Sequence, residues 1–320
     1  MKSTPGLDVR VLRMFEAVAA SGSLSEGAKS LGVTQSAVSQ AIAQIEAILQ
    51  TQVLDRSRRP LRLTPAGIAL SRRARQIIDD VDRLVIHVRD ADLASKPAIR
   101  VGMIDSFAAT AGPEIVQRLT ATASQVLFWS GLAYSQSAAL LNRQLDLIVT
   151  PDPVEDADRL IRRSIFSEPF IVVVPATRAA EFRKADLKTL IERLPFIRFS
   201  GRSHFGSGIE RYLRRCGHSP RPFLEIDTSD VVMGMVGAGL GWAITTPLCY
   251  FQARAYAAQV VAMPLPGPAL SRSIYQVSRE DEFEELAESC FQASRNVLQD
   301  EIFPRIRELL PWIKTGIALS

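Results

Sequence analysis

Four uncharged polar side chains stand close together in residues 32–49, which read GVTQSAVSQAIAQIEAIL. They are Gln35, Ser36, Ser39 and Gln40, and no charged residue follows them until Glu46. On a helix, these four residues share one side of the first turns. Amide and hydroxyl groups at the start of a helix can hydrogen-bond to base edges in the DNA major groove, and glutamine pairs well with adenine. The alternative interpretation is a group of residues that simply suit a first helical turn.

The elements around this polar surface have the pattern of a helix-turn-helix. Apolar residues at helical spacing predict a helix from about residue 7 that ends at Gly22. A shorter helix should follow, starting from a serine cap at 23 or 25 and ending at Gly32. Thr34 then caps a third helix, and the tight glycine turn between the last two completes the motif. The predicted buried stripe of the third helix is Val38, Ile42, Ile45 and Leu49.

A cluster of arginines follows the third helix. Arg56, Arg58, Arg59 and Arg62 lie around Pro60, between short strand-like pairs of residues. A two-stranded wing with this composition can lie along DNA phosphates or enter a minor groove. We therefore predict that the arginines contact the DNA backbone.

The charge distribution favours the same partner. The whole chain has a net charge of +4, but residues 1–75 hold 11 Lys and Arg against 5 Asp and Glu, a net charge of +6. The remaining residues carry a net charge of −2. The basic excess is therefore confined to the N-terminal quarter, which indicates a polyanion partner there. A basic face exposed only to solvent is the alternative.

A long helix with a regular apolar repeat should follow the wing. Thr64 is a cap and Pro65 suits the first helical position, and the helix is predicted to run to about Ser95. The spacing alternates between four and three residues, as in a coiled coil, which favours pairing with a second copy of the chain. The alternative is a helix packed on its own domain. The repeating residues are Leu70, Ala74, Ile77, Val81, Leu84, Val88 and Ala91.

Composition limits the remaining classes of protein. With 320 residues and 47% hydrophobic residues, the chain can build two or three globular domains. No apolar run approaches the roughly 20 residues that span a bilayer, and residues 1–10 lack the apolar core of a secretory signal. The widely spaced Cys216, Cys249 and Cys290 fit neither a disulfide framework nor a metal site, and only three histidines are present. We expect a cytoplasmic protein without a membrane, metal or cofactor partner.

Strand and helix patterns alternate after residue 97. AIRVGMID (98–105), QVLFWSG (125–131) and LDLIVT (145–150) read as strands with helices between them, which predicts an open parallel sheet. EPFIVVVP (168–175) opens a second set of elements, and SRSIYQVSR (271–279) reads as a late strand returning to the first sheet. Two α/β lobes joined by crossing strands leave a cleft at the carboxyl ends of strands, where ligands usually bind.

Three enzyme-like or redox features have simpler explanations. GMVGAGLG (234–241) follows a helix and precedes a strand, the reverse of a dinucleotide-binding fingerprint, so it reads as a helix end at Gly239 or Gly241. Ser106 and His204 lack a G-x-S-x-G motif and a third triad member, so we expect no catalysis. The sequence shows no basic pocket around the thiols of Cys216 and Cys290, which favours buried, unreactive cysteines over a redox switch.

The N-terminal residues resemble the LysR-type transcriptional regulator family. The resemblance lies in MFEAVAASGSLSEGAKSLGVTQSAVSQAIAQIEAIL, VLDR and LRLTPAGIAL, in that order over about 65 residues. It implies a winged helix-turn-helix followed by a long dimerising helix, with DNA contacts from the polar surface and the arginine cluster. The family usually has proline where Ser36 stands and glycine near Gln50, so the preferred DNA sequence of other members cannot be transferred.

The C-terminal part resembles the effector-binding region of the same family, through RVGMIDS, LLNRQLDLIV, EPFIVVVP and GMVGAGLGWAITTP. This resemblance implies a small-molecule cleft between two lobes similar to those of periplasmic binding proteins. Arg202 could attract a carboxylate, which would make the effector anionic, although a lone loop arginine is more often solvated. The implied cleft residues are Ser106, Phe107, Ala133, Gln136, Arg202, Ser203, His204, Phe205, Thr245 and Thr246.

These observations predict an α/β protein that regulates transcription by binding double-stranded DNA and a small-molecule effector. Two chains should pair through the long helix, and the resemblance implies a homotetramer of two dimers. The alternative is a stand-alone solute-binding protein without DNA specificity. The predicted domains are the winged helix-turn-helix (1–65), the linker helix (66–95) and the effector-binding domain (96–320), with lobe 1 at 96–172 and 271–305, lobe 2 at 173–270 and a C-terminal extension at 306–320.

Overall fold

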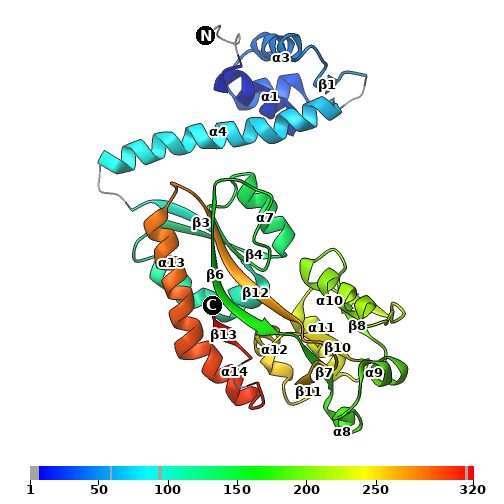
Figure 1. Cartoon of the computed structure of the whole chain (residues 1–320). Coiled ribbons are helices and arrows are strands. Elements are labelled where there is room, and N and C mark those ends of the chain that lie inside the picture. The colour runs from blue at the N-terminus through cyan, green and yellow to red at the C-terminus, as the bar shows by residue number, and fades with distance from the viewer. Residues whose placement is uncertain (1–6, 58–59, 93–95, 314–315) are drawn as a thin grey trace. The chain divides into compact units, whose positions relative to one another are not determined.

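The computed structural model describes residues 7–57, 60–92, 96–313 and 316–320, and gives only the backbone for residue 83 and residues 85–92. The chain forms two compact units, residues 1–95 and 96–320 (Figure 1). Among the described residues, no helix combines the length and apolar character needed to cross a membrane.

The first unit contains the predicted helix-turn-helix and wing. The Thr34 hydroxyl accepts a hydrogen bond from the Ala37 backbone N–H, and Gly22 ends the first helix in the left-handed conformation at φ +65°. Both predicted helix boundaries are therefore confirmed. The elements are α1 (Val9–Ser21), α2 (Leu24–Ser30), α3 (Gln35–Leu49), β1 (Leu54–Asp55), β2 (Arg62–Leu63) and α4 (Pro65–Asp92).

The core of this unit confirms most of the predicted stripe on α3. Val38, Ile42 and Ile45 are fully buried against the side chains of α1 and β1. Leu49 was predicted to be buried but is 38% exposed, because α3 ends there and the chain turns away at Gln50. Gln50 itself adopts the left-handed conformation, at φ +51°, that glycine would take more readily.

The first half of α4 packs on its own unit. Ala74 is fully buried and Leu70 is half-buried against the helix-turn-helix core. An ion pair of 2.6 Å joins Arg75 Nε to Glu16 Oε2 on α1, and Arg13 of α1 pairs with Asp82 further along α4. The alternative drawn from the sequence, a helix packed on its own domain, therefore holds for this half.

Lobe 1 of the second unit is a six-stranded sheet in the order β13-β6-β12-β5-β3-β4. Strands β5, β3 and β4 are parallel as predicted, but β12, β6 and β13 are antiparallel, so the expected parallel sheet is mixed. The elements up to the crossing strand are β3 (Ala98–Ile104), α5 (Asp105–Thr110), α6 (Gly112–Leu119), β4 (Gln125–Gly131), α7 (Ala133–Leu141), β5 (Leu147–Thr150) and β6 (Leu160–Pro169).

Lobe 2 contains a three-stranded antiparallel sheet, β10-β7-β11, and the parallel pair β8-β9. Strand β7 already pairs with lobe 2 from Ile171, two residues before the predicted boundary at 173. The elements are β7 (Ile171–Pro175), α8 (Ala179–Phe182), α9 (Leu187–Arg193), β8 (Ile197–Phe199), α10 (His204–Arg215), β9 (Leu224–Ile226), α11 (Ser229–Gly237), β10 (Ala243–Thr245), α12 (Pro247–Gln252) and β11 (Val260–Pro264).

The chain returns to lobe 1 through β12 (Ser271–Arg279), as the sequence predicted. Strands β6 and β12 form an antiparallel pair along their whole lengths, and this pair connects lobe 1 with lobe 2 (Figure 1). Helices α13 (Glu284–Val297) and α14 (Phe303–Leu309) then cover lobe 1, joined by a π-helical turn at 298–302.

The C-terminal extension is part of the lobe 1 core. Ile306, Leu310 and Ile317 are buried in the same cluster as the strands, and β13 (Ala318–Leu319) pairs with the edge of β6. The sequence pattern alone assigns no role to this segment, and the structure shows that it adds an edge strand to the sheet.

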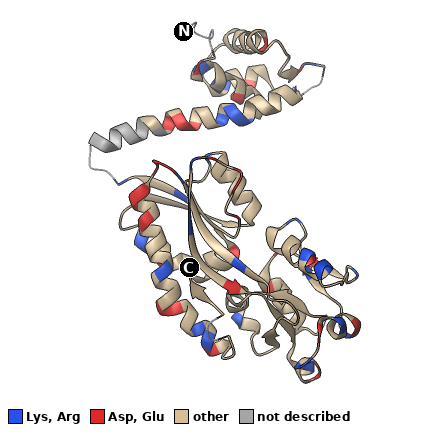
Figure 2. Cartoon of the chain, in the orientation of Figure 1, with Lys and Arg blue, Asp and Glu red and all other residues tan. Residues whose placement is uncertain are grey.

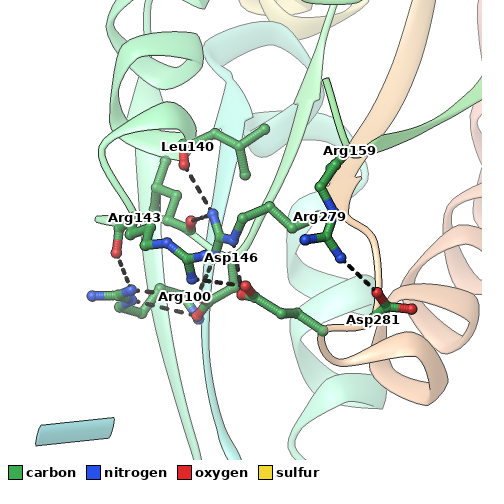
Figure 3. Close-up of polar contacts among 9 residues, drawn as sticks. Arg100, Leu140, Arg143, Asp146, Arg159, Arg279 and Asp281 are labelled. Carbon is green, nitrogen blue, oxygen red and sulfur yellow. Dashed lines mark hydrogen bonds and ion pairs between the residues drawn. The ribbon is translucent and has the colours of Figure 1, made fainter. Parts of the chain in front are cut away.

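A buried ionic network lies at the α7–β5 end of lobe 1 (Figure 3). The Asp146 carboxylate accepts hydrogen bonds from the Arg100 backbone N–H at 2.9 Å and from Arg279 Nη2 at 3.0 Å. Arg279 also donates to the carbonyl oxygens of Leu140 and Leu145. Asp146 is only 4% exposed, so its charge depends on these partners.

We predict that Asp146→Ala lowers the free energy of unfolding by about 3 kcal/mol, because it removes the buried carboxylate of the network and leaves the Arg279 guanidinium with only its less buried partner, Glu282. Urea denaturation followed by circular dichroism measures the change. The matched control is Asp281→Asn, which breaks the exposed 3.0 Å pair with Arg159 shown in Figure 3, keeps a residue that tolerates the left-handed backbone at φ +61°, and should cost about 0–1 kcal/mol. Equal losses in the two variants would contradict the assignment.

Candidate functional site

The polar surface predicted on the third helix lies on the exposed side of α3. Gln35, Ser36 and Gln40 are exposed and Ser39 is half-buried, while the opposite side of the helix forms the core. The Ser25 hydroxyl donates a 3.1 Å hydrogen bond to Gln35 Oε1, which links α2 to the start of α3. The structure therefore brings all four predicted side chains together on the side of α3 opposite the core.

Two of the four arginines predicted to contact DNA, Arg56 and Arg62, lie within the described part of the wing. Arg62 is exposed on β2, whereas the Arg56 guanidinium pairs with Glu46 Oε2 of α3 at 2.9 Å. Arg58 and Arg59 lie outside the described residues. Arg56 is still 56% exposed, so its ion pair orients the guanidinium along the end of α3 without covering it.

The long helix also exposes apolar residues of the predicted seam. Ile77 is 45% exposed and Leu84 is 61% exposed, and Val81 is half-buried. The side chain of Val88 lies outside the described residues. Ile77 and Leu84 of the predicted seam are therefore exposed, whereas Leu70 and Ala74 of the same repeat are covered by their own unit.

A cavity of about 60 Å³ lies in the cleft between the two lobes, which here form one unit. Five of the predicted cleft residues line it: Ser106, Ala133, Ser203, His204 and Phe205. Ser106 lies at the start of α5, after the carboxyl end of β3, and the other lobe contributes the start of α10. The cavity therefore lies beside the strand ends at which the sequence places the cleft.

The other five predicted residues do not line this cavity. Phe107 is fully buried and stacks on Phe166, and Gln136 is buried and donates from Nε2 to the Met103 carbonyl. Thr245 is buried within β10. The remaining two are engaged elsewhere: Arg202 is exposed and pairs with Asp227 at 3.5 Å, and Thr246 Oγ1 accepts a hydrogen bond from Arg272.

Ser203 lines the cavity but also caps α10. Its hydroxyl donates to the Ser200 carbonyl at 2.7 Å and accepts from the Gly206 backbone N–H at 2.9 Å. The hydroxyl is therefore largely used to start the helix. His204, the next residue, is exposed at the mouth of the cavity.

Arg272 is a cleft residue that the sequence did not indicate. It lies on β12, its side chain is only 9% exposed, and its guanidinium pairs with Glu168 of β6 at 2.7 Å. Glu168 Oε2 also accepts a hydrogen bond from the Leu248 backbone N–H of α12. The guanidinium stacks over the Phe205 ring, with 4.8 Å between its carbon and the ring centroid. A strand arginine 104 residues from its partner leaves no local signal in the sequence.

Asp105, Thr228 and Ser229 also line the cavity and were missed. Asp105 directly precedes Ser106, and the other two follow β9 in the polar run DTSD, so position after a strand was the available signal. Burial raises the pKa of Asp105 above its ordinary value of 3.8; the Ser130 hydroxyl lowers this pKa, and the nearby Asp230 carboxylate raises it.

Of the two cysteines that the sequence predicts to be buried, Cys290 is buried and Cys216, which follows α10, is only half-buried. Cys290 is fully buried in the core, and burial raises the pKa of its thiol to about 12. The thiolate, which is the reactive form, is therefore not populated near neutral pH. Cys249 is buried beside Arg272, with 3.5 Å between Sγ and Nη2.

Two family models match the chain. Residues 9–68 match the model described as bacterial regulatory helix-turn-helix protein, lysR family, and residues 94–299 match the LysR substrate binding domain. Among curated proteins, the regulator YofA of Bacillus velezensis is 28% identical over 253 residues, covering 76% of this chain and 83% of that protein. The regulator GltR of Bacillus subtilis is 24% identical over 237 residues, covering 73% of this chain and 78% of that protein.

Solved structures with the same fold include full-length CbnR bound to its target DNA and full-length BenM. The CbnR complex has a TM-score of 0.62 and 20% identity, covering 91% of this chain and 99% of that chain. BenM has a TM-score of 0.55 and 22% identity, covering 92% of this chain and 98% of that chain.

The raised pKa of Asp105 predicts a pH effect on stability. The folded state holds this proton more tightly than the unfolded state, so the stabilisation is fully present below pH 3.8 and is lost as the pH rises through the raised pKa. The stability of Asp105→Asn, measured relative to wild type, should therefore be higher at pH 7 than at pH 3.5. The reason is that wild type loses its contribution from the bound proton as the pH rises. Thermal unfolding from pH 3.5 to 7.5 measures this difference, with the exposed Asp158→Asn as control. A difference that does not change with pH would contradict the assignment.

Proposed function

The chain belongs to the LysR family and is a DNA-binding transcriptional regulator with an effector-binding domain, and from this premise we propose how its own residues perform the two binding tasks. The polar side of α3 reads bases in the major groove through Gln35, Ser36, Ser39 and Gln40. The wing arginines 56, 58, 59 and 62 hold the adjacent phosphates. The observation that carries this assignment is the exposed, uncharged polar side of a helix whose other side is core.

The effector binds in the cleft between the lobes, against Ser106, Ala133, His204 and Phe205. An effector changes the regulator only if it binds one arrangement of the lobes better than another. A tenfold preference supplies about 1.4 kcal/mol per site, which is enough to shift two nearly balanced states. The same cavity contains Ser106 and His204, but no hydrogen bond joins them among the described contacts, and we assign them to binding rather than catalysis.

Two chains pair through the exposed part of α4, and two such dimers form the tetramer. Ile77 and Leu84 supply the apolar surface, since Leu70 and Ala74 already pack on their own unit. The pairing places two α3 helices on half-sites about one DNA turn apart. We propose that the protein acts in the cytoplasm, where its DNA is.

Selection of bound duplexes from a random pool tests the proposed function. A palindromic consensus is expected, because two symmetric copies of α3 read two half-sites. Binding that shows no preference among duplexes at moderate ionic strength would overturn the regulator assignment and favour a stand-alone small-molecule-binding protein.

Gln35→Ala should weaken binding to the selected duplex by about 1–3 kcal/mol and leave binding to random duplexes almost unchanged, because the amide contacts base edges. Fluorescence anisotropy titrations with both duplexes measure the two affinities. Arg62→Ala is the contrasting variant: it should weaken both complexes and reduce the slope of log affinity against log salt by about one. If Gln35→Ala weakens both complexes equally, α3 does not read sequence.

Leu84→Asp should dissociate the assembly, since it places a carboxylate in the apolar seam of α4. Light scattering measures the molar mass, which is expected to fall from that of four 35.2 kDa chains to that of two or fewer, because the contact between dimers does not use Leu84. Arg72→Asp puts the same carboxylate on an exposed α4 position outside the seam and should leave the mass unchanged. An unaltered mass in Leu84→Asp would reject pairing through this helix.

A further inference from the structure

A second pocket, of about 700 Å³, opens beside the cleft between α10 and β12. This volume falls within the range of small-molecule sites. Pro151, His204, Phe205 and Arg272 line both this pocket and the smaller cavity described above, so the two spaces adjoin. Lobe 1 contributes Pro151 and Pro153, lobe 2 contributes α10, and the crossing strand β12 lies between them.

The charge on the pocket wall has one sign. Four arginines line it, Arg211, Arg214 and Arg215 on α10 and Arg272 on β12, and none of its described lining residues is acidic. Figure 2 shows the basic residues gathered on α10. Arg272 is already neutralised by Glu168, whereas the described ion pairs include none from a carboxylate to the three α10 arginines. Arg211 donates only to the Ser207 hydroxyl, at 3.3 Å.

These arginines have a simpler explanation, because cations in the last turn of a helix offset its dipole. The two glycines of α10 indicate that this helix also shapes a binding pocket. A Cβ at Gly206 would lie 2.2 Å from the Ser200 carbonyl oxygen, so packing requires that glycine. A Cβ at Gly208 would meet only the end of the Arg211 side chain, at 3.9 Å, so packing does not require this one. Because Gly208 has no side chain, the pocket stays open at this point of its wall. The same face of the helix carries His204, Arg211 and Arg215.

We propose that this arginine pocket binds a small organic anion with at least two negative charges, such as a polycarboxylate or a phosphate ester. This anion is the effector itself or the charged group of a larger effector. The proposal rests on the effector-binding role given above and defines its ligand class. Single exposed arginine–carboxylate pairs contribute little, so affinity from solution needs several charges against several arginines. Phe170, Tyr275 and Pro153 provide apolar contacts for the carbon skeleton. Such a ligand touches both lobes and therefore favours one arrangement of them.

Isothermal titration calorimetry of the full chain tests this proposal with propane-1,2,3-tricarboxylate, glycerol 2-phosphate and acetate at matched ionic strength. Saturable binding is expected for one or both multivalent anions and not for acetate. The double variant Arg214→Gln/Arg215→Gln should weaken that binding at least tenfold. Gly208→Leu should also weaken it, because the new side chain fills the pocket. The control Arg183→Gln removes an exposed arginine elsewhere on lobe 2 and should bind like wild type.

Failure of both multivalent anions to bind overturns the proposal, as does an equal loss in the control variant. Thermal unfolding of each variant separates loss of binding from loss of folding, and Gly208→Leu provides a substitution that leaves every charge in place. If the arginine variants instead weaken binding to random duplex DNA and leave anion binding intact, the α10 surface contacts nucleic acid and the pocket assignment is wrong. The duplex selection described above tests the regulator role separately, since it needs no anion.

Discussion

The buried ion pair between Glu168 and Arg272 constrains the whole second unit, because it lies where the two lobes meet. Glu168 is fully buried on β6, and Arg272 is almost so on the antiparallel partner β12. Burial by itself would lower the pKa of Arg272, but the Glu168 carboxylate raises it above its ordinary value, so the guanidinium stays charged. A buried charge of this kind depends on all of its partners. Those partners come from α12 and α10 of lobe 2 as well as β6, so the position of lobe 2 and the shape of the cleft are set together.

In the first unit, the core determines what is available for DNA. Helix α3 uses Val38, Ile42 and Ile45 to pack on α1 and β1, which fixes its rotation. With that rotation fixed, the uncharged side of the helix faces solvent and the wing follows at its end. The ion pair between Arg56 and Glu46 links the wing directly to α3. The module thus presents a rigid polar surface flanked by basic groups, which suits base reading supported by phosphate contacts.

The cleft separates residues that hold the fold from residues that are free to bind. Ser203 and Thr246 carry the hydroxyl groups expected of a ligand site, yet one caps α10 and the other accepts a hydrogen bond from Arg272. Ser106 and His204 remain on the cavity wall. Arg202, the arginine expected to attract an anion, is paired with Asp227. The arginines of α10 line the larger pocket and provide positive charge there. The proposed selectivity for an anionic ligand therefore depends on the α10 side of the cleft.

The sequence alone determined the features that depend on local chemistry. Caps such as Thr34, the glycine ending at Gly22, the helical spacing of the α3 core and the strand–helix alternation after residue 97 all act within a few residues, so their patterns are legible. The family resemblance extended this to the regulator function. Only the tertiary structure decided which strands of lobe 1 run antiparallel, where the C-terminal segment packs, and which cleft side chains are free. The pair from Glu168 to Arg272 spans 104 residues, and the burial that makes each charge depend on the other is not encoded in any local pattern.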